Sequence, residues 1–124
     1  MNQFKGQKIL IVEDNLISYK LVEAHMKGKN LHLVHANDGQ QAIEKFEQYP
    51  DIDIILMDIQ LPNLDGLEVT RKIRKSNKEI PIIATTANVF DEDRIASKEA
   101  GCNAFIAKPI NFVELFELLN QYLQ

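Results

Sequence analysis

Three acidic residues, a lysine and a threonine are the side chains of this 124-residue chain whose types and positions could do chemistry together. Glu13 and Asp14 directly follow one dense apolar run, and Asp58 follows another. Carboxylates that share a pocket oppose one another's ionisation, so the cluster requires compensation by protons, a lysine or a divalent cation. Oxygen ligands of this kind suit Mg²⁺. Lys108 adds a positive charge with three donors, and Thr86 adds a hydroxyl donor.

This set of groups suits phosphoryl transfer. A carboxylate can attack phosphorus and form an aspartyl-phosphate, provided that a metal and cationic donors neutralise the oxygens of the transferred group. Asp58 is the predicted nucleophile because it stands at the tip of a central strand. Glu13 and Asp14 can hold the metal from the side.

The elements that position these side chains are visible as alternating segments. Runs rich in Ile, Leu and Val that are too short for helices predict strands buried on both faces. The predicted strands are Lys8–Val12, His32–Ala36, Ile52–Met57, Ile82–Thr85 and Ala104–Ile106.

Longer amphipathic stretches with helix-start signals separate the strands. Asp38 with Gln41, and Asn111 with Glu114, have the spacing of capping boxes, and Gly101 is a predicted left-handed C-cap. The two capping boxes begin helices, and the other helices are predicted at Asn15–Lys27, Asp65–Lys75 and Asp91–Ala100.

The alternation predicts an α/β fold of the flavodoxin-like (βα)5 type. We expect a doubly wound parallel sheet of five strands in the order 2-1-3-4-5, with helices on both faces. Ligands of such sheets bind at the carboxyl ends of the strands, where the strand order reverses. Residues after the strands, including Asn88 after the fourth, should therefore share one edge. The length predicts a single domain over residues 1–124.

Composition excludes several classes of protein. Hydrophobic residues make up 45% of the chain and charged residues 26%, as in an ordinary globular domain. The net charge of -4 provides no basic field, so we expect no direct binding of nucleic acid. The single cysteine, Cys102, excludes an internal disulfide. Without a recognisable signal peptide or membrane span, we expect a cytoplasmic domain that makes no membrane contact.

The chemistry-bearing motifs, taken in chain order, resemble the receiver domain of two-component response regulators. They are Glu13-Asp14, LMDIQLPNLDG around Asp58, PIIATTA around Thr86 and AFIAKPI around Lys108. The segments MDIQLPNLDGLEVTRKIR and AGCNAFIAKPI are most similar to receivers fused to hybrid sensor histidine kinases.

The resemblance implies a phosphoacceptor with a metal site. Asp58 would accept a phosphoryl group from a phosphohistidine on a sensor histidine kinase or a histidine phosphotransfer domain. Mg²⁺ would be bound by Glu13, Asp14, Asp58 and the backbone carbonyl of Gln60. Such a protein catalyses its own phosphorylation and slow dephosphorylation but is not a turnover enzyme.

The resemblance also implies a conformational switch. Thr86 would hydrogen-bond one phosphoryl oxygen, and Lys108 would pair with another. Phe105 matches the aromatic switch position, which often holds Tyr in this family. Partner contacts would change with this switch, in a monomer or a weak phosphorylation-dependent dimer.

The sequence disfavours three other functions. A haloacid-dehalogenase-like phosphohydrolase places its nucleophile in an Asp-x-Asp motif, but the residue two after Asp58 is Gln60. A flavodoxin-like flavin carrier needs a Ser/Thr/Gly-rich loop where this chain has EDN. A degenerate receiver that only docks is disfavoured because every position of the constellation is filled.

The first helix is predicted to expose Leu16 and Tyr19 beside the site, as contacts for the phosphoryl donor. Both would lie outside a buried apolar stripe that has a histidine at its centre. The predicted stripe is Ile17, Leu21, Val22 and Met26, with His25 between them as a core histidine.

Overall fold

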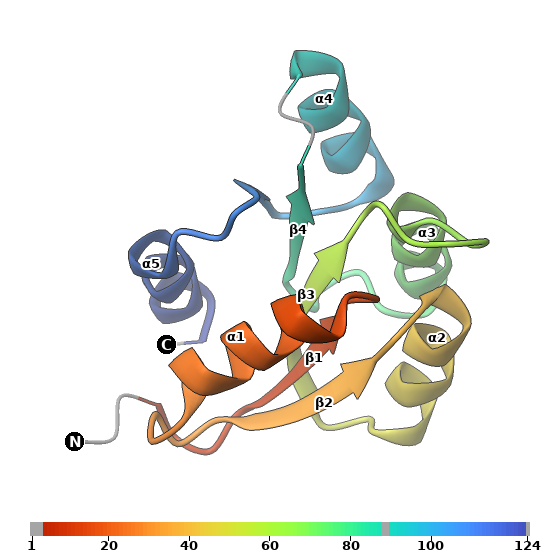
Figure 1. The fold of residues 1–124 in the computed structure, drawn as a ribbon. Helices are drawn as coiled ribbons and strands as arrows, with labels where there is room; N and C mark the ends of the chain where they lie inside the picture. Colours follow the sequence, from red (N-terminus) through yellow and green to blue (C-terminus); the bar gives the residue numbers. More distant parts are fainter. Residues whose placement is uncertain (1–3, 88–89, 124) are drawn as a thin grey trace.

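A computed structural model describes residues 4–87 and 90–123 of the chain (Figure 1). Asn88, predicted to lie at the functional edge, is outside these described residues. Within them, strands and helices alternate as predicted. The strands are β1 (Lys8–Val12), β2 (His32–Ala36), β3 (Ile52–Asp58), β4 (Ile82–Thr86) and β5 (Ala104–Ala107). The helices are α1 (Leu16–Met26), α2 (Gly39–Gln48), α3 (Gly66–Ser76), α4 (Asp91–Ala100) and α5 (Phe112–Leu123).

All described strands belong to one parallel sheet in the order β2-β1-β3-β4-β5, which confirms the predicted topology. β3, β4 and β5 each continue one residue beyond the predicted end. The reason is that backbone pairing continues where the apolar run stops: Asp58 pairs with Thr85, and Thr86 pairs with Ala107. Two of the predicted site residues, Asp58 and Thr86, are therefore the last residues of their strands.

Helices cover both faces of the sheet, with α1 and α5 on one face and α2, α3 and α4 on the other (Figure 1). The central strand β3 supplies side chains to both layers. Ile54 and Leu56 pack in the core on the α1 and α5 side, whereas Ile55 and Met57 pack in the core on the other side. This double burial explains why the strand is apolar without alternation.

The predicted helix starts and the C-cap are confirmed, although the Gln41 side chain accepts from the Asn37 N–H at 2.8 Å and not from the Asp38 N–H of a capping box. The side chain of Asp38 accepts a hydrogen bond from the Gln41 backbone N–H at 2.8 Å, and Asn111 accepts one from Glu114 at 3.1 Å. Gly101 ends α4 with a φ of 117°, in the left-handed region that glycine adopts without strain.

The predicted buried stripe of α1 is confirmed at Val22 and Met26 and wrong at Ile17 and Leu21. Ile17 is 82% exposed and Leu21 is 52% exposed, whereas the buried positions are Tyr19, Val22 and Met26. Apolar residues lie on two faces of this helix, so periodicity alone does not decide which face is buried. The buried face instead includes Tyr19, which packs in one core cluster with Ile9 and Ile11 of the sheet.

His25 is not a core histidine, because the structure places it on the exposed side of α1. Its Nδ1 lies 2.9 Å from the carbonyl oxygen of Leu21, one turn earlier. Its ring stacks on Phe112 at the start of α5, with centroids 3.6 Å apart. The histidine therefore bridges two helices at the surface.

Candidate functional site

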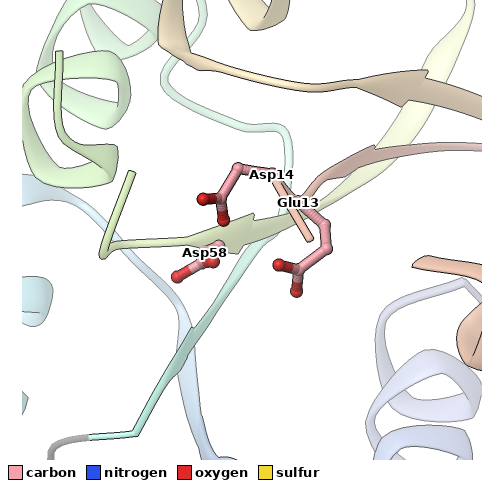
Figure 2. A group of neighbouring side chains, drawn as sticks. All are labelled: Glu13, Asp14 and Asp58. Carbon is pink, nitrogen blue, oxygen red and sulfur yellow. The ribbon is translucent and has the colours of Figure 1, made fainter. Parts of the chain in front are cut away.

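Three carboxylates meet at the carboxyl ends of β1 and β3 (Figure 2). Glu13 and Asp14 follow β1, and Asp58 is the last residue of β3. One oxygen from each of the three lies within 4.8 Å of the others. Glu13 and Asp58 are 4% and 2% exposed, whereas Asp14 is exposed. Two acids of the cluster, Glu13 and Asp58, are therefore buried, and Asp14 lies on its solvent-exposed side.

Lys108 supplies the cation that the cluster requires. From the segment after β5, its Nζ donates to Glu13 Oε1 at 2.8 Å and to Asp58 Oδ2 at 3.0 Å. Its backbone N–H donates to the Thr86 carbonyl at 2.8 Å, which fixes the start of this segment against β4. The structure therefore brings together the carboxylates and the lysine that are far apart in sequence.

A tight turn after β3 orients the Asp58 carboxylate. Its Oδ1 accepts a hydrogen bond from the Gln60 backbone N–H at 2.9 Å, while Oδ2 is held by Lys108. The turn packs closely against the start of α3, where a Cβ on Gly66 would overlap the Asp58 carbonyl oxygen. A residue without a side chain is required at position 66 for this approach.

Burial raises the pKa of Asp58 to about 6, and the nearby Glu13 charge acts in the same direction. The Gln60 amide and Lys108 oppose this effect but do not cancel it. Burial alone would lower the pKa of Lys108, but its hydrogen bonds to Glu13 and Asp58 and their charges outweigh burial and raise it. The lysine is therefore a firmly charged group inside the cluster.

The donor set fits a hard divalent cation, which the sequence predicts as Mg²⁺. Three carboxylates converge, and their combined negative charge exceeds the single charge of Lys108. Asp14 lies on the open side, where a hydrated ion could approach. Gln60, predicted as a ligand through its backbone carbonyl, lies in the same turn, and its side-chain Oε1 accepts a hydrogen bond from the Ala87 N–H at 3.0 Å.

The two predicted switch residues lie on neighbouring strands. Thr86 is buried at the end of β4, and Phe105 is partly buried on β5. The register pairs Ala84 with Phe105, so Thr86 and Phe105 project from the same face of the sheet, one pleat apart. The guanidinium carbon of Arg94 lies 5.2 Å from the Phe105 ring centroid and covers it from α4.

The two predicted docking residues have different environments. Leu16 is 62% exposed, as expected, but Tyr19 is only 8% exposed, so its predicted surface position is wrong. Leu21 is also exposed and borders a mainly apolar hollow of about 340 Å³ between α1 and the segment after β5. Phe112 lines the same hollow, as does Lys108 of the carboxylate cluster.

His35 is a site-adjacent residue to which sequence reasoning assigned no role. Its Nε2 lies 2.9 Å from the carbonyl oxygen of Glu13. The sequence does place His35 near the carboxyl end of the predicted second strand, which lies beside the first strand. A strand histidine gives no indication in sequence of which backbone group it reaches.

A comparison with protein families places the chain. Residues 9–120 match the family model described as the response regulator receiver domain. This chain belongs to that family. Among curated receiver proteins, it is 37% identical over 122 residues to hybrid signal transduction histidine kinase L of Dictyostelium discoideum, covering 93% of this chain. It is 34% identical to the polar-differentiation response regulator DivK of Brucella anthropi, covering 94% of this chain and 96% of that protein.

The receiver spans only a small part of several relatives. It covers 7% of the length of the Dictyostelium kinase and 19% of transcription factor SKN7 of Saccharomyces cerevisiae, which is 37% identical over 120 residues and covers 97% of this chain. The family therefore occurs both within long signalling proteins and as a protein of nearly this length.

Solved receiver structures are also similar. The receiver domain of a sensor histidine kinase from Pseudomonas aeruginosa, with magnesium coordinated in its active-site cleft, has a TM-score of 0.87 and 39% identity, covering 96% of this chain and 98% of that one. A Saccharomyces cerevisiae receiver domain, solved with a histidine phosphotransfer signalling protein, has a TM-score of 0.90 and 27% identity, covering 97% and 90% of the two chains.

Among the described parts of the chain, none of the helices combines the length and the apolar character that crossing a bilayer requires.

Proposed function

We propose that this receiver domain accepts a phosphoryl group on Asp58, in a Mg²⁺-dependent reaction, from a phosphohistidine of a sensor histidine kinase or a histidine phosphotransfer domain. The modification then changes its contacts with partners. The observation that carries this proposal is the buried Asp58 carboxylate, fixed between Lys108 and the Gln60 N–H within a cluster of three acids. The domain accepts one phosphoryl group and does not turn over a small-molecule substrate.

In the transfer step, an oxygen of Asp58 forms a bond to phosphorus while the phosphorus–nitrogen bond of the donor breaks. The imidazole leaves with the electron pair of that bond and then takes up a proton. Lys108, already 3.0 Å from Asp58 Oδ2, pairs with an oxygen of the transferred group, and the Thr86 hydroxyl donates to another. Glu13, Asp14, Asp58 and the Gln60 carbonyl would hold Mg²⁺, which would supply the remaining neutralisation of the phosphoryl charge.

Two comparisons support this proposal. The Pseudomonas receiver is described with magnesium in its active-site cleft, and the Saccharomyces receiver with a histidine phosphotransfer protein. The proposal is tested by incubating the domain with acetyl phosphate and Mg²⁺ and recording its intact mass. Gain of one phosphoryl group is expected, and omission of Mg²⁺ should prevent it.

Asp14 provides the sharpest test of the metal site because it is exposed. Asp14→Asn keeps the shape of the side chain but removes one of the three negative charges, so we expect labelling at fixed Mg²⁺ to fall by about 100-fold. Thermal unfolding should be nearly unchanged, since surface substitutions usually alter stability by less than about 0.5 kcal/mol. Undiminished labelling would contradict the metal assignment.

The exposed face of α1 is the proposed docking surface for the phosphoryl donor. Leu16 and Leu21 are both more than half exposed, and Leu21 borders the hollow that reaches Lys108. An apolar helix of the donor could pack there and present its phosphohistidine to Asp58. We expect Leu16→Asp combined with Leu21→Asp to slow transfer from a phosphorylated histidine phosphotransfer domain by at least about 10-fold.

Acetyl phosphate separates docking from chemistry because it needs no protein interface. The double variant should be labelled by acetyl phosphate at the wild-type rate. Ile95→Asp is the matched control, since Ile95 is 57% exposed on α4, and it should retain normal rates with both donors. Equal losses with both donors would mean that the α1 substitutions damage the site itself.

The proposed switch links Thr86 to Phe105. An anionic phosphoryl oxygen accepts a stronger hydrogen bond than a neutral acceptor, so Thr86 should move toward it. The Phe105 ring, now partly exposed beneath Arg94, can then turn inward to fill the vacated space. The Gln60–Ala87 hydrogen bond must adjust as the end of β4 moves.

Beryllofluoride, which mimics the phosphoryl group, tests this coupling by nuclear magnetic resonance. We expect chemical-shift changes at Phe105 and along α4 and α5, in addition to those around Asp58. In Thr86→Ala, the distant changes should shrink while those around Asp58 persist. Shifts confined to the loops around Asp58 in the wild-type domain would contradict the switch.

We infer a cytoplasmic domain that binds neither nucleic acid nor membrane, and that is a monomer or a weak phosphorylation-dependent dimer. The net charge of -4 supports the absence of nucleic-acid binding.

A further inference from the structure

We propose that His35 is a positioning residue, whose imidazole holds the peptide between Glu13 and Asp14 in the orientation that directs both acids to the cluster. This inference rests on the proposed function, because it concerns the same metal and phosphoryl site.

The backbone ladder explains why a side chain is needed at this point. Pairing between β1 and β2 ends with Val12 and Ala36, and the Glu13 N–H still donates to the Ala36 carbonyl at 3.0 Å. The Glu13 carbonyl lies beyond the last ladder pair and is 2.9 Å from His35 Nε2. A carbonyl oxygen can only accept, so Nε2 must carry the proton of this hydrogen bond.

The imidazole is itself held in place by Tyr19. Their rings are stacked with centroids 3.7 Å apart and 7° between the planes. Tyr19 is buried in α1, so it restricts rotation of the histidine ring from one side. The stacked ring lies on the buried side of α1, whereas Ile17 and Leu21 lie on its exposed side.

The first turn of α1 also contacts the Glu13 side chain. The Tyr19 N–H donates to the Asn15 carbonyl at 3.0 Å, and the Asn15 N–H lies 3.2 Å from Glu13 Oε2. Together with Lys108 on Oε1, these contacts hold Glu13 through its N–H, its carbonyl and both carboxylate oxygens. His35 supplies the contact at the carbonyl.

The peptide that His35 holds leads directly into Asp14. Without the imidazole, the Glu13 carbonyl loses its hydrogen bond and the peptide plane can rotate toward another donor. Asp14 would move most, since it is exposed, whereas Glu13 remains tied to Lys108 and Asn15. Outer contacts that orient metal ligands typically change metal affinity or activity by about 10- to 100-fold.

The test compares His35→Leu with His35→Gln. Leu removes the donor, whereas the Gln amide nitrogen is the same number of bonds from the backbone as Nε2 and can still donate. Because the chain has no tryptophan, Mg²⁺ binding is best followed by nuclear magnetic resonance at the Asp14 and Gln60 amides. Exposed His32 on the same strand provides the control variant His32→Leu.

We expect His35→Leu to raise the Mg²⁺ dissociation constant about 10-fold, and His35→Gln and His32→Leu to stay within about twofold of wild type. Labelling by acetyl phosphate should slow in His35→Leu at low Mg²⁺ and recover at saturating Mg²⁺. Wild-type affinity in His35→Leu, or an equal loss in His35→Gln, would overturn the positioning role. Failure of the wild-type domain to bind Mg²⁺ would overturn the proposed function as well, so the two failures are distinguishable. If His35→Leu does not fold, His35→Ala, which also removes the donor, takes its place, and wild-type Mg²⁺ affinity in that variant would overturn the positioning role.

Discussion

Asp58→Asn is expected to abolish phosphorylation and to stabilise the folded domain at the same time. An amide oxygen is a poor nucleophile, so neither acetyl phosphate nor a phosphohistidine should label the variant. We expect a loss of at least about 1,000-fold, measured by intact mass after incubation with Mg²⁺. The same substitution removes a buried negative charge that lies beside Glu13.

The stability gain should depend on pH, and its sign follows from the pKa of Asp58. Because burial raises this pKa from 3.8 to about 6, the folded state binds a proton more tightly than the unfolded chain does. The wild-type domain therefore loses stability as pH rises from about 4 through about 6. We expect Asp58→Asn to gain about 1 kcal/mol at pH 7.5, since solvent at the open side screens part of the effect, and the gain should vanish near pH 4.

Asp51→Asn is the matched control for this prediction. Asp51 is an exposed carboxylate whose pKa is lowered, chiefly by its hydrogen bond from Lys8. Its replacement should leave phosphorylation unchanged and should give no stability gain at pH 7.5. A pH-independent gain in Asp58→Asn, or continued labelling of that variant, would contradict the assigned role.

Lys108→Ala is the second substitution with a large expected effect. It leaves Glu13 and Asp58 buried without their shared cation, so we expect a loss of about 2 kcal/mol in the free energy of unfolding at pH 7.5. The loss should shrink at lower pH as Asp58 takes up a proton. Mg²⁺ should raise the Tm of the variant more than that of wild type, because a divalent ion can replace the missing charge.

Labelling separates a structural role of Lys108 from a catalytic one. At saturating Mg²⁺, the folded variant should still be labelled about 100-fold more slowly, since a fixed cation on the phosphoryl oxygens is missing. Lys8→Ala is the control, because Lys8 pairs with Asp51 at 2.8 Å outside the cluster and should change neither property substantially. Normal labelling by Lys108→Ala would restrict the lysine to a structural role.

Much of the fold is predictable because local and global signals agree. β1 has the predicted ends, because a dense apolar run in a parallel sheet is buried on both faces. β2 also has the predicted ends, but the expectation that it is buried on both faces is wrong, because it is an edge strand whose first residue is exposed and whose next three are only partly buried. The strand order then places Glu13, Asp14 and Asp58 at one edge without further information. The acidic cluster could therefore be predicted from topology.

The sequence did not predict correctly which face of α1 is buried, because two orientations of this helix fit the same apolar periodicity. In α1, a stripe centred on Ile17 and Leu21 is as apolar as the stripe that contains Tyr19, so periodicity favours neither. The choice depends on the stacking of Tyr19 on His35, which is a contact between residues far apart in sequence. The sequence also does not show which carboxylate oxygens Lys108 contacts, because these hydrogen bonds join residues far apart in the chain.

Trapping the phosphorylated residue tests the central claim most directly. The wild-type domain is treated with acetyl phosphate and Mg²⁺, reduced with borohydride, digested and mapped by mass spectrometry. Borohydride reduces an aspartyl-phosphate to an alcohol, so the modified peptide should contain homoserine at position 58 and nowhere else. Reduction at Glu13, Asp14 or any other acid, or a phosphoryl group that survives borohydride on another residue type, would contradict the account.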